Sequence, residues 1–204
     1  EGDYNRRALR FSNQNPENRS ALLAALSNIG VRARSYETCV RADHPLLQLF
    51  FRNILDLKPY AQNKRVPDFI FAAPKHLLSS FLRGYYDGDG SVHGNAHRSY
   101  VEASTTSETL ARELQHLLLH FGIVATLWHG FEKRNNADKF KVLFSGVTNF
   151  ERFLEIGFNH PIKQARLIAY PKAKQWRRSM QIPLDANTRA FIATNGYEAW
   201  IKSD

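Results

Sequence analysis

The most constraining feature of this sequence is an internal repeat. The stretch at 104–122 (STTSETLARELQHLLLHFG) resembles the stretch at 12–30 (SNQNPENRSALLAALSNIG) at a constant separation of 92 residues. Both copies begin with polar residues, continue with leucines at helical spacing and end in glycine, which is typical of a helix with its caps. A chain with two such copies is expected to form two similar halves related by a pseudo-twofold axis.

The separation between the copies changes along the chain. Upstream it falls to 88 residues, which pairs Glu1 with Asp89, and downstream it grows to 99 residues, which pairs Lys64 with Lys163. The two halves therefore carry charged residues at equivalent positions.

The repeat predicts how the chain is divided. We expect a first half over residues 1–73, a second half over residues 74–175 and a C-terminal extension over residues 176–204. In the first half we expect a strand ending near residue 12, a helix over 16–30, a strand or hairpin over 31–40 and a second helix over 44–57.

The strands of the second half alternate between apolar and polar residues. Val101 and Ala103 alternate with Tyr100 and Glu102, as expected for a strand with one buried face. The pattern predicts an α/β fold of the α+β kind, in which antiparallel sheets pack one face on helices.

A central helix is predicted from residue 74 to the run Asp87-Gly88-Asp89-Gly90. Its apolar side chains spread around more than one side, so we expect it to be buried on two faces. Two carboxylates at a helix C-terminus oppose the macrodipole unless a cation such as a divalent metal is present. A glycine-rich cap leading into a hairpin is an equally simple interpretation of this run. An EF-hand is excluded, because the required Glu is replaced by Arg98.

The charge balance indicates a polyanionic partner. Lys and Arg number 28 against 19 Asp and Glu, giving a net charge of +9. Nucleic acid is the usual partner of such a chain. No apolar run reaches the roughly 18–20 residues of a membrane span, and the single Cys39 excludes an internal disulfide. We therefore expect an intracellular protein that is neither secreted nor bound to a membrane.

The polar faces of the predicted strands are candidates for DNA binding, because a two-stranded ribbon can enter the major groove. An ordinary solvated sheet face is the alternative. The candidate residues are Arg10, Arg32, Arg34, Tyr36, Arg98, Tyr100, Glu102, Lys139 and Lys141.

The nonapeptide at 82–90 (LRGYYDGDG) resembles the signature motif of the LAGLIDADG homing endonucleases, including the endonuclease domains carried inside inteins. The segments at 63–70 (NKRVPDFI) and 153–158 (FLEIGF) are similar to segments around the endonuclease core of inteins. The opening Glu1-Gly2-Asp3 resembles the end of a first copy of the motif. The resemblance extends to about residue 175.

The resemblance implies an αββαββα unit used twice, with the sheets forming a saddle and the two motif helices side by side at the pseudo-twofold axis. It implies that Glu1 and Asp89 are metal-binding carboxylates, with the Gly88 carbonyl as a further ligand, and that Lys64 and Lys163 lie near the reaction centre. The implied activity is site-specific, Mg²⁺-dependent hydrolysis of double-stranded DNA, a hydrolase reaction.

Two alternatives stay open from the sequence. A non-cleaving DNA- or RNA-binding protein, either a maturase or a transcription factor, can use the same fold. The resemblance also implies a motif helix before Glu1, which the sequence does not contain. We expect a monomer with pseudo-twofold symmetry, with that helix supplied by a longer chain or by a second chain.

Overall fold

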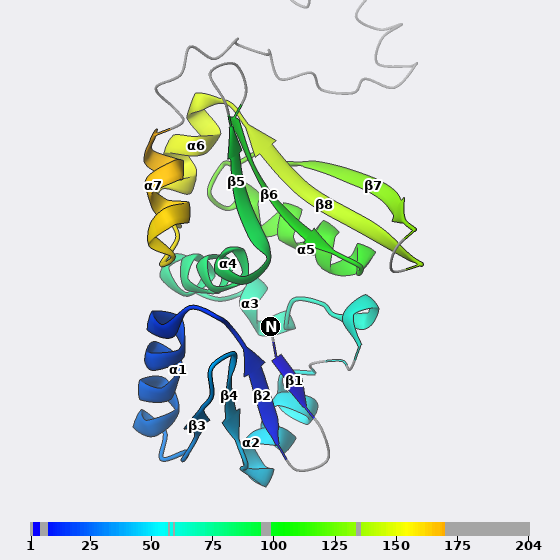
Figure 1. Cartoon of the computed structure of the whole chain (residues 1–204). Helices are drawn as coiled ribbons and strands as arrows, with labels where there is room; N and C mark the ends of the chain where they lie inside the picture. The colour runs from blue at the N-terminus through cyan, green and yellow to red at the C-terminus, as the bar shows by residue number, and fades with distance from the viewer. Residues whose placement is uncertain are drawn as a thin grey trace, which may run out of the picture.

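The computed structural model describes residues 2–4, 8–56, 58, 60–94, 99–133 and 136–169, and for residues 2–4 only the backbone. The described chain forms two four-stranded antiparallel sheets with helices packed on them (Figure 1). The predicted α+β fold is therefore confirmed.

The two sheets have equivalent strand orders. The first contains, in spatial order, β1 (Gly2–Tyr4), β2 (Leu9–Ser12), β4 (Cys39–Ala42) and β3 (Arg34–Ser35). The second contains β5 (Gly90–Gly94), β6 (Ser99–Thr105), β8 (Ala137–Ser145) and β7 (Thr126–Glu132). This order is what the internal repeat predicts, while the boundaries of the halves stay a prediction.

The repeated sequence corresponds to two equivalent helices, α1 (Pro16–Asn28) and α5 (Glu108–Leu119). The Asn15 side chain caps α1, and the Ser107 side chain caps α5 by accepting the backbone N–H of Leu110. The glycines that follow the two helices, Gly30 and Gly122, have positive φ angles of 75° and 69°. The repeat thus preserves both capping groups of the helix.

The second helix of the first half differs from its prediction. The expected helix over 44–57 begins as α2 (Pro45–Leu49) but continues as a π-helical turn, Phe50–Ile54. A short 3-10 turn, Ala61–Asn63, and α3 (Asp68–Phe71) follow in the connector. The second half ends with α6 (Val147–Phe153) and α7 (Pro161–Ala169). The predicted extension over 176–204 lies outside the described residues.

The central helix is α4 (Lys75–Asp89), which lies between the two sheets in Figure 1. Leu78, Leu82 and Tyr86 are buried in the core of the second half. Leu77 is 49% exposed, and a Cβ added at Gly84 meets nothing within 4 Å. Among the described residues, α4 therefore buries one broad apolar face, and the expectation of two buried faces is wrong there.

The core is unevenly divided between the halves. The larger cluster joins α4, α5, α6 and α7 to the second sheet around Tyr86, Phe144 and Phe153, whose rings pack edge-on or tilted. The smaller cluster lies under the first sheet and includes Leu9 and Val40. The end of α4 is thus anchored in the larger core. No helix in the described ranges combines the length and apolar character needed to span a membrane.

Candidate functional site

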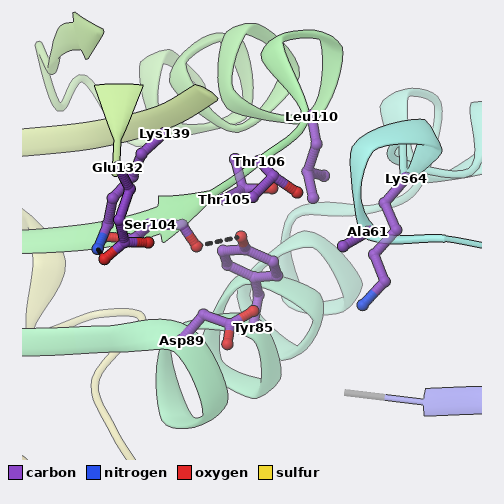
Figure 2. Close-up of a pocket in the computed structure, with 10 residues that line it drawn as sticks. All are labelled: Ala61, Lys64, Tyr85, Asp89, Ser104, Thr105, Thr106, Leu110, Glu132 and Lys139. Carbon is purple, nitrogen blue, oxygen red and sulfur yellow. Dashed lines mark hydrogen bonds and ion pairs between the residues drawn. The ribbon is translucent and has the colours of Figure 1, made fainter. Parts of the chain in front are cut away.

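The last residue of α4, Asp89, lines a pocket of about 170 Å³. Figure 2 shows Lys64 on one side of this pocket and Glu132 with Lys139 on the other. Tyr85 lies across its floor and donates its hydroxyl to the Ser104 carbonyl at 3.4 Å. The remaining lining residues are Ala61, Thr105, Thr106 and Leu110. The structure therefore brings together three residues that the sequence singled out, Asp89, Lys64 and Lys139.

Lys64 belongs to the connector of the first half, but the second half holds its backbone. The Ser107 hydroxyl donates to the Lys64 carbonyl at 2.6 Å. Two residues further on, the Val66 N–H donates to the Glu113 carboxylate, also at 2.6 Å. Both partners come from the start of α5, so one pocket wall is fixed by contacts between the halves.

Asp87 is buried and its carboxylate points away from the metal role that a DGDG run suggests. It accepts the backbone N–H of Asn159 at 3.0 and 3.1 Å and that of His160 at 3.2 Å. These N–H groups lie immediately before α7, where the helix dipole favours a negative charge. The sequence argument that both carboxylates require a cation is therefore wrong for Asp87.

Lys163 comes from the first turn of α7 and reaches back to α4. Its Nζ donates to the carbonyls of Asp87 at 2.7 Å and Tyr86 at 3.2 Å, at the negative end of the helix dipole. Burial lowers the pKa of Lys163, and the charges of Asp87 and Asp89 act in the opposite direction. The structure thus places Lys163 at the same helix end as Asp89, although it does not line the pocket. Gly88 lies exposed in the last turn of α4.

The predicted alternation of the second sheet is confirmed. Val101, Ala103, Phe140, Val142 and Phe144 are buried. The candidate DNA contacts Tyr100, Glu102, Lys139 and Lys141 are half-buried on the other side of their strands.

The charged residues on that side already have partners in the protein. Glu102 accepts the Lys141 ammonium through both oxygens at 3.1 Å. Lys141 also lies 5.6 Å from the centroid of the Trp128 ring. Lys139 is 3.5 Å from the Glu132 carboxylate. The ring of His93 stacks on Tyr100 at a centroid distance of 4.9 Å.

The first sheet carries a row of arginines across its strands. Arg10 of β2 is directly opposite Arg41 of β4, which is in turn opposite Arg34 of β3. Asp43 forms a hydrogen bond and an ion pair with Arg41 and raises the pKa of its guanidinium. Like charges in register are costly without an anionic partner. The predicted candidates Arg32 and Tyr36 are exposed next to this row.

Arg41 is a residue that the sequence analysis missed. Its neighbours Val40 and Ala42 are fully buried, while Arg41 points outward. The alternation of Val40, Arg41 and Ala42 was the signal, but the predicted strand stopped at residue 40. The predicted site residues Glu1 and Arg98 lie outside the described residues. In both figures β1, which follows Glu1, begins beside the end of α4.

Comparison with known protein families matches residues 77–156 to the model of the LAGLIDADG-like domain. This stretch contains α4, the second sheet and α5, and therefore most of the residues that form the pocket. The resemblance drawn from the nonapeptide is confirmed.

Curated relatives share a limited part of their length with this chain. A glutamine–fructose-6-phosphate aminotransferase of Methanocaldococcus jannaschii is 34% identical over 126 residues, which are 61% of this chain and 11% of that protein. A probable translation initiation factor IF-2 of Thermococcus kodakarensis is 30% identical over 79% of this chain and 14% of its own. A DNA gyrase polypeptide of Mycolicibacterium flavescens is 28% identical over 95% of this chain and 36% of its own.

Solved structures also resemble this chain. Full-length DUF199/WhiA from Thermatoga maritima superposes with a TM-score of 0.51 at 17% sequence identity, covering 97% of this chain and 62% of that one, and therefore shares the fold. I-DmoI, solved in complex with DNA and Mn, has a TM-score of 0.49 at 11% identity, covering 73% of this chain and 79% of that one.

Proposed function

From the LAGLIDADG-like domain that residues 77–156 of this chain form, we propose that the protein is a site-specific endonuclease that hydrolyses double-stranded DNA with Mg²⁺. The observation that carries the proposal is the position of Asp89. It ends α4 in a pocket that also contains Lys64, while Lys163 approaches the same helix end from α7.

The arrangement suits hydrolysis of a phosphodiester. The scissile phosphate is an anion, and two ammonium groups near one carboxylate favour its binding and the charge that develops on its oxygens. Burial lowers the pKa of Lys163, so its proton is held less tightly than that of an exposed lysine. Lys163 is therefore suited to exchange a proton with a water molecule near the phosphate.

The donors at the end of α4 fit Mg²⁺. Mg²⁺ binds through one or two carboxylates, retains several waters and accepts phosphate oxygens. Asp89 and the carbonyl of Gly88 are the ligands we propose, with Glu1 as the second carboxylate. Asp87 is not among them, because its oxygens accept the N–H groups of Asn159 and His160. When bound, the ion supplies positive charge for the non-bridging oxygens.

The DNA-binding surface we propose consists of the outward sides of the two sheets. The first supplies the arginine row of Arg10, Arg41 and Arg34, and the second supplies Lys139 and Lys141. The net charge of +9 supports this assignment, because phosphate contacts dominate the affinity of proteins for DNA. Tyr100, Glu102 and Trp128 add groups that can contact base edges.

We further propose that the domain is of the intein type. The relatives are named as an aminotransferase, an initiation factor and a gyrase, and these names have no activity in common. Each shares 36% or less of its length with this chain. A segment shared in this way by unrelated proteins has the distribution of an inserted element, so the matched segment and not the host activity is the appropriate guide.

A non-cleaving DNA- or RNA-binding protein is the second candidate. The observation that favours it is that the charged sheet faces are formed without Asp89 or its pocket. Such a protein needs these faces but not the carboxylate. The two candidates therefore differ in what they require of Asp89.

The deciding experiment uses a plasmid library with a randomised segment, incubated with the protein and Mg²⁺. We expect linear DNA enriched in one sequence, and no linear product with Asp89→Asn or with EDTA. The matched control is Asp138→Asn, because Asp138 is an exposed carboxylate that pairs with His129. Specific binding of the library without any cut product rejects the endonuclease and favours the second candidate.

A further inference from the structure

One side of α4 carries polar residues at intervals of four, and each of them contacts the segment between α6 and α7. Lys75 pairs with the Glu155 carboxylate at 2.8 Å, and Ser79 donates to the Glu155 carbonyl at 3.3 Å. Arg83 donates to the Ile156 carbonyl at 2.6 Å. Asp87 completes the row by accepting the N–H groups that precede α7. Residues four apart lie on one helix face, so the row joins α4 to this segment along its length.

The last member of the row differs from the others because its contact is reciprocal. The Asp87 carboxylate accepts two backbone N–H groups at the start of α7, and Lys163 of α7 donates to the Asp87 carbonyl. Each helix therefore places a charge of the favourable sign at the end of the other. The two contacts lie within one turn of α7, so they fix both its position and its direction at this point.

We propose that Asp87 is a positioning residue that holds the ammonium group of Lys163 at the end of α4, beside Asp89. The proposal rests on the proposed function for the catalytic relevance of Lys163, but the placement itself is independent of cleavage. A lysine side chain has four rotatable bonds, and its head group is placed well only if its backbone is fixed. Asp87 fixes that backbone by binding the N–H groups of Asn159 and His160.

The alternative is that Asp87 serves stability alone. A buried carboxylate with three hydrogen bonds contributes to folding wherever it lies, and its loss is costly. The test therefore needs a readout that general destabilisation does not change. Ser79→Ala is the matched control, because it removes a contact of the same row two turns earlier without touching Lys163.

The first arm measures single-turnover cleavage in a double-mutant cycle. Asp87→Asn keeps the shape of the side chain but loses the charge, and we expect it to slow cleavage about 10²-fold with little change in DNA affinity. In a Lys163→Met background the same change should cost less than about twofold more, because Asp87 acts through Lys163. A purely structural role predicts the same factor in both backgrounds.

The second arm does not depend on cleavage. The intact chain is treated briefly with N-hydroxysuccinimide acetate, and acetylation is read at each lysine by mass spectrometry. We expect Asp87→Asn to raise the acetylation rate of Lys163 about threefold or more, because the half-buried ammonium is released. Lys139 and Lys141 serve as internal references, and Ser79→Ala should leave the rate at Lys163 unchanged.

The outcomes separate the two proposals. If the unaltered protein does not cut DNA, the proposed function fails and the acetylation arm alone decides the role of Asp87. If Asp87→Asn leaves Lys163 acetylation unchanged, or slows cleavage equally in both backgrounds, the positioning role is rejected. Circular dichroism verifies the fold of each variant, and Asp87→Ser, which retains one oxygen acceptor, replaces Asp87→Asn should that variant fail to fold.

Discussion

The hydroxyl of Ser107 donates to the backbone carbonyl of Lys64 at 2.6 Å, although the two residues belong to different copies of the internal repeat. Ser107 also caps α5, so one side chain both starts that helix and holds the segment that carries Lys64. Ser107 is 1% exposed, and water therefore does not compete for its hydroxyl. The position of Lys64 in the pocket thus depends on the second half of the protein.

Replacing Lys64 separates catalysis from DNA binding. We expect Lys64→Met to slow single-turnover cleavage about 10²–10³-fold, because it removes a positive charge from the pocket around Asp89. Lys64→Arg should recover part of the loss, and the affinity for DNA should change less than about tenfold. Lys75→Met is the control, because Lys75 pairs with Glu155 away from the pocket. Parallel losses of cleavage and affinity would show that Lys64 only contacts phosphates.

The ion pair between Glu102 and Lys141 limits the charge available to DNA. We expect Glu102→Gln to release Lys141, to strengthen non-specific DNA binding and to steepen the slope of log affinity against log salt by up to about 0.9. Fluorescence anisotropy at several salt concentrations measures the slope. Glu108→Gln is the control, because Glu108 pairs with Arg112 on α5. An unchanged slope would place Lys141 outside the DNA interface.

Tyr86 determines how stability responds to alkali. Its side chain is fully buried, and burial raises the pKa of its phenol above the ordinary value. Because the unfolded chain loses this proton above about pH 10 while the folded protein keeps it, stability falls as the pH rises. We expect Tyr86→Phe to reduce this alkaline loss, as measured by urea unfolding at about pH 8 and about pH 11.

The same substitution should cost little near neutral pH. Within the described part of the chain, the Tyr86 hydroxyl has no hydrogen-bond partner, so its removal leaves no donor unpaired. We expect a change within about 0.5 kcal/mol at pH 8. Tyr85→Phe is the comparison, because the Tyr85 hydroxyl donates to the Ser104 carbonyl and its loss should destabilise by about 1 kcal/mol. A large loss at neutral pH in Tyr86→Phe would contradict this account.

Two glycines at the end of α4 should respond to alanine with opposite signs. A Cβ at Gly90 would lie 2.5 Å from the Tyr86 carbonyl oxygen, so Gly90→Ala forces the backbone to move and should cost about 1–3 kcal/mol. A Cβ at Gly84 meets nothing within 4 Å, and Gly84→Ala should stabilise the helix by about 0.5–1 kcal/mol. Thermal unfolding of both variants measures the difference, and equal shifts would contradict it.

The sequence by itself determined the local structure and its duplication. Helix caps, strand alternation and the nonapeptide all depend on residues that are neighbours in the chain, so their patterns are visible without a fold. The equivalent strand orders of the two sheets and the match of residues 77–156 follow from these patterns. The assignment of Asp89 to a pocket shared with Lys64 agrees with the pairing of the copies.

Only the tertiary structure decided how the charges of these residues are used. The partners of Asp87 lie more than 70 residues away along the chain, as do those of Lys163, so no local pattern distinguishes Asp87 from Asp89. For the same reason the sequence did not show that Glu102 already binds Lys141. Which carboxylate faces a helix terminus, a lysine or the pocket is set by the packing of α7 and the sheet against α4, because electrostatic interactions depend on distance and burial rather than on residue type.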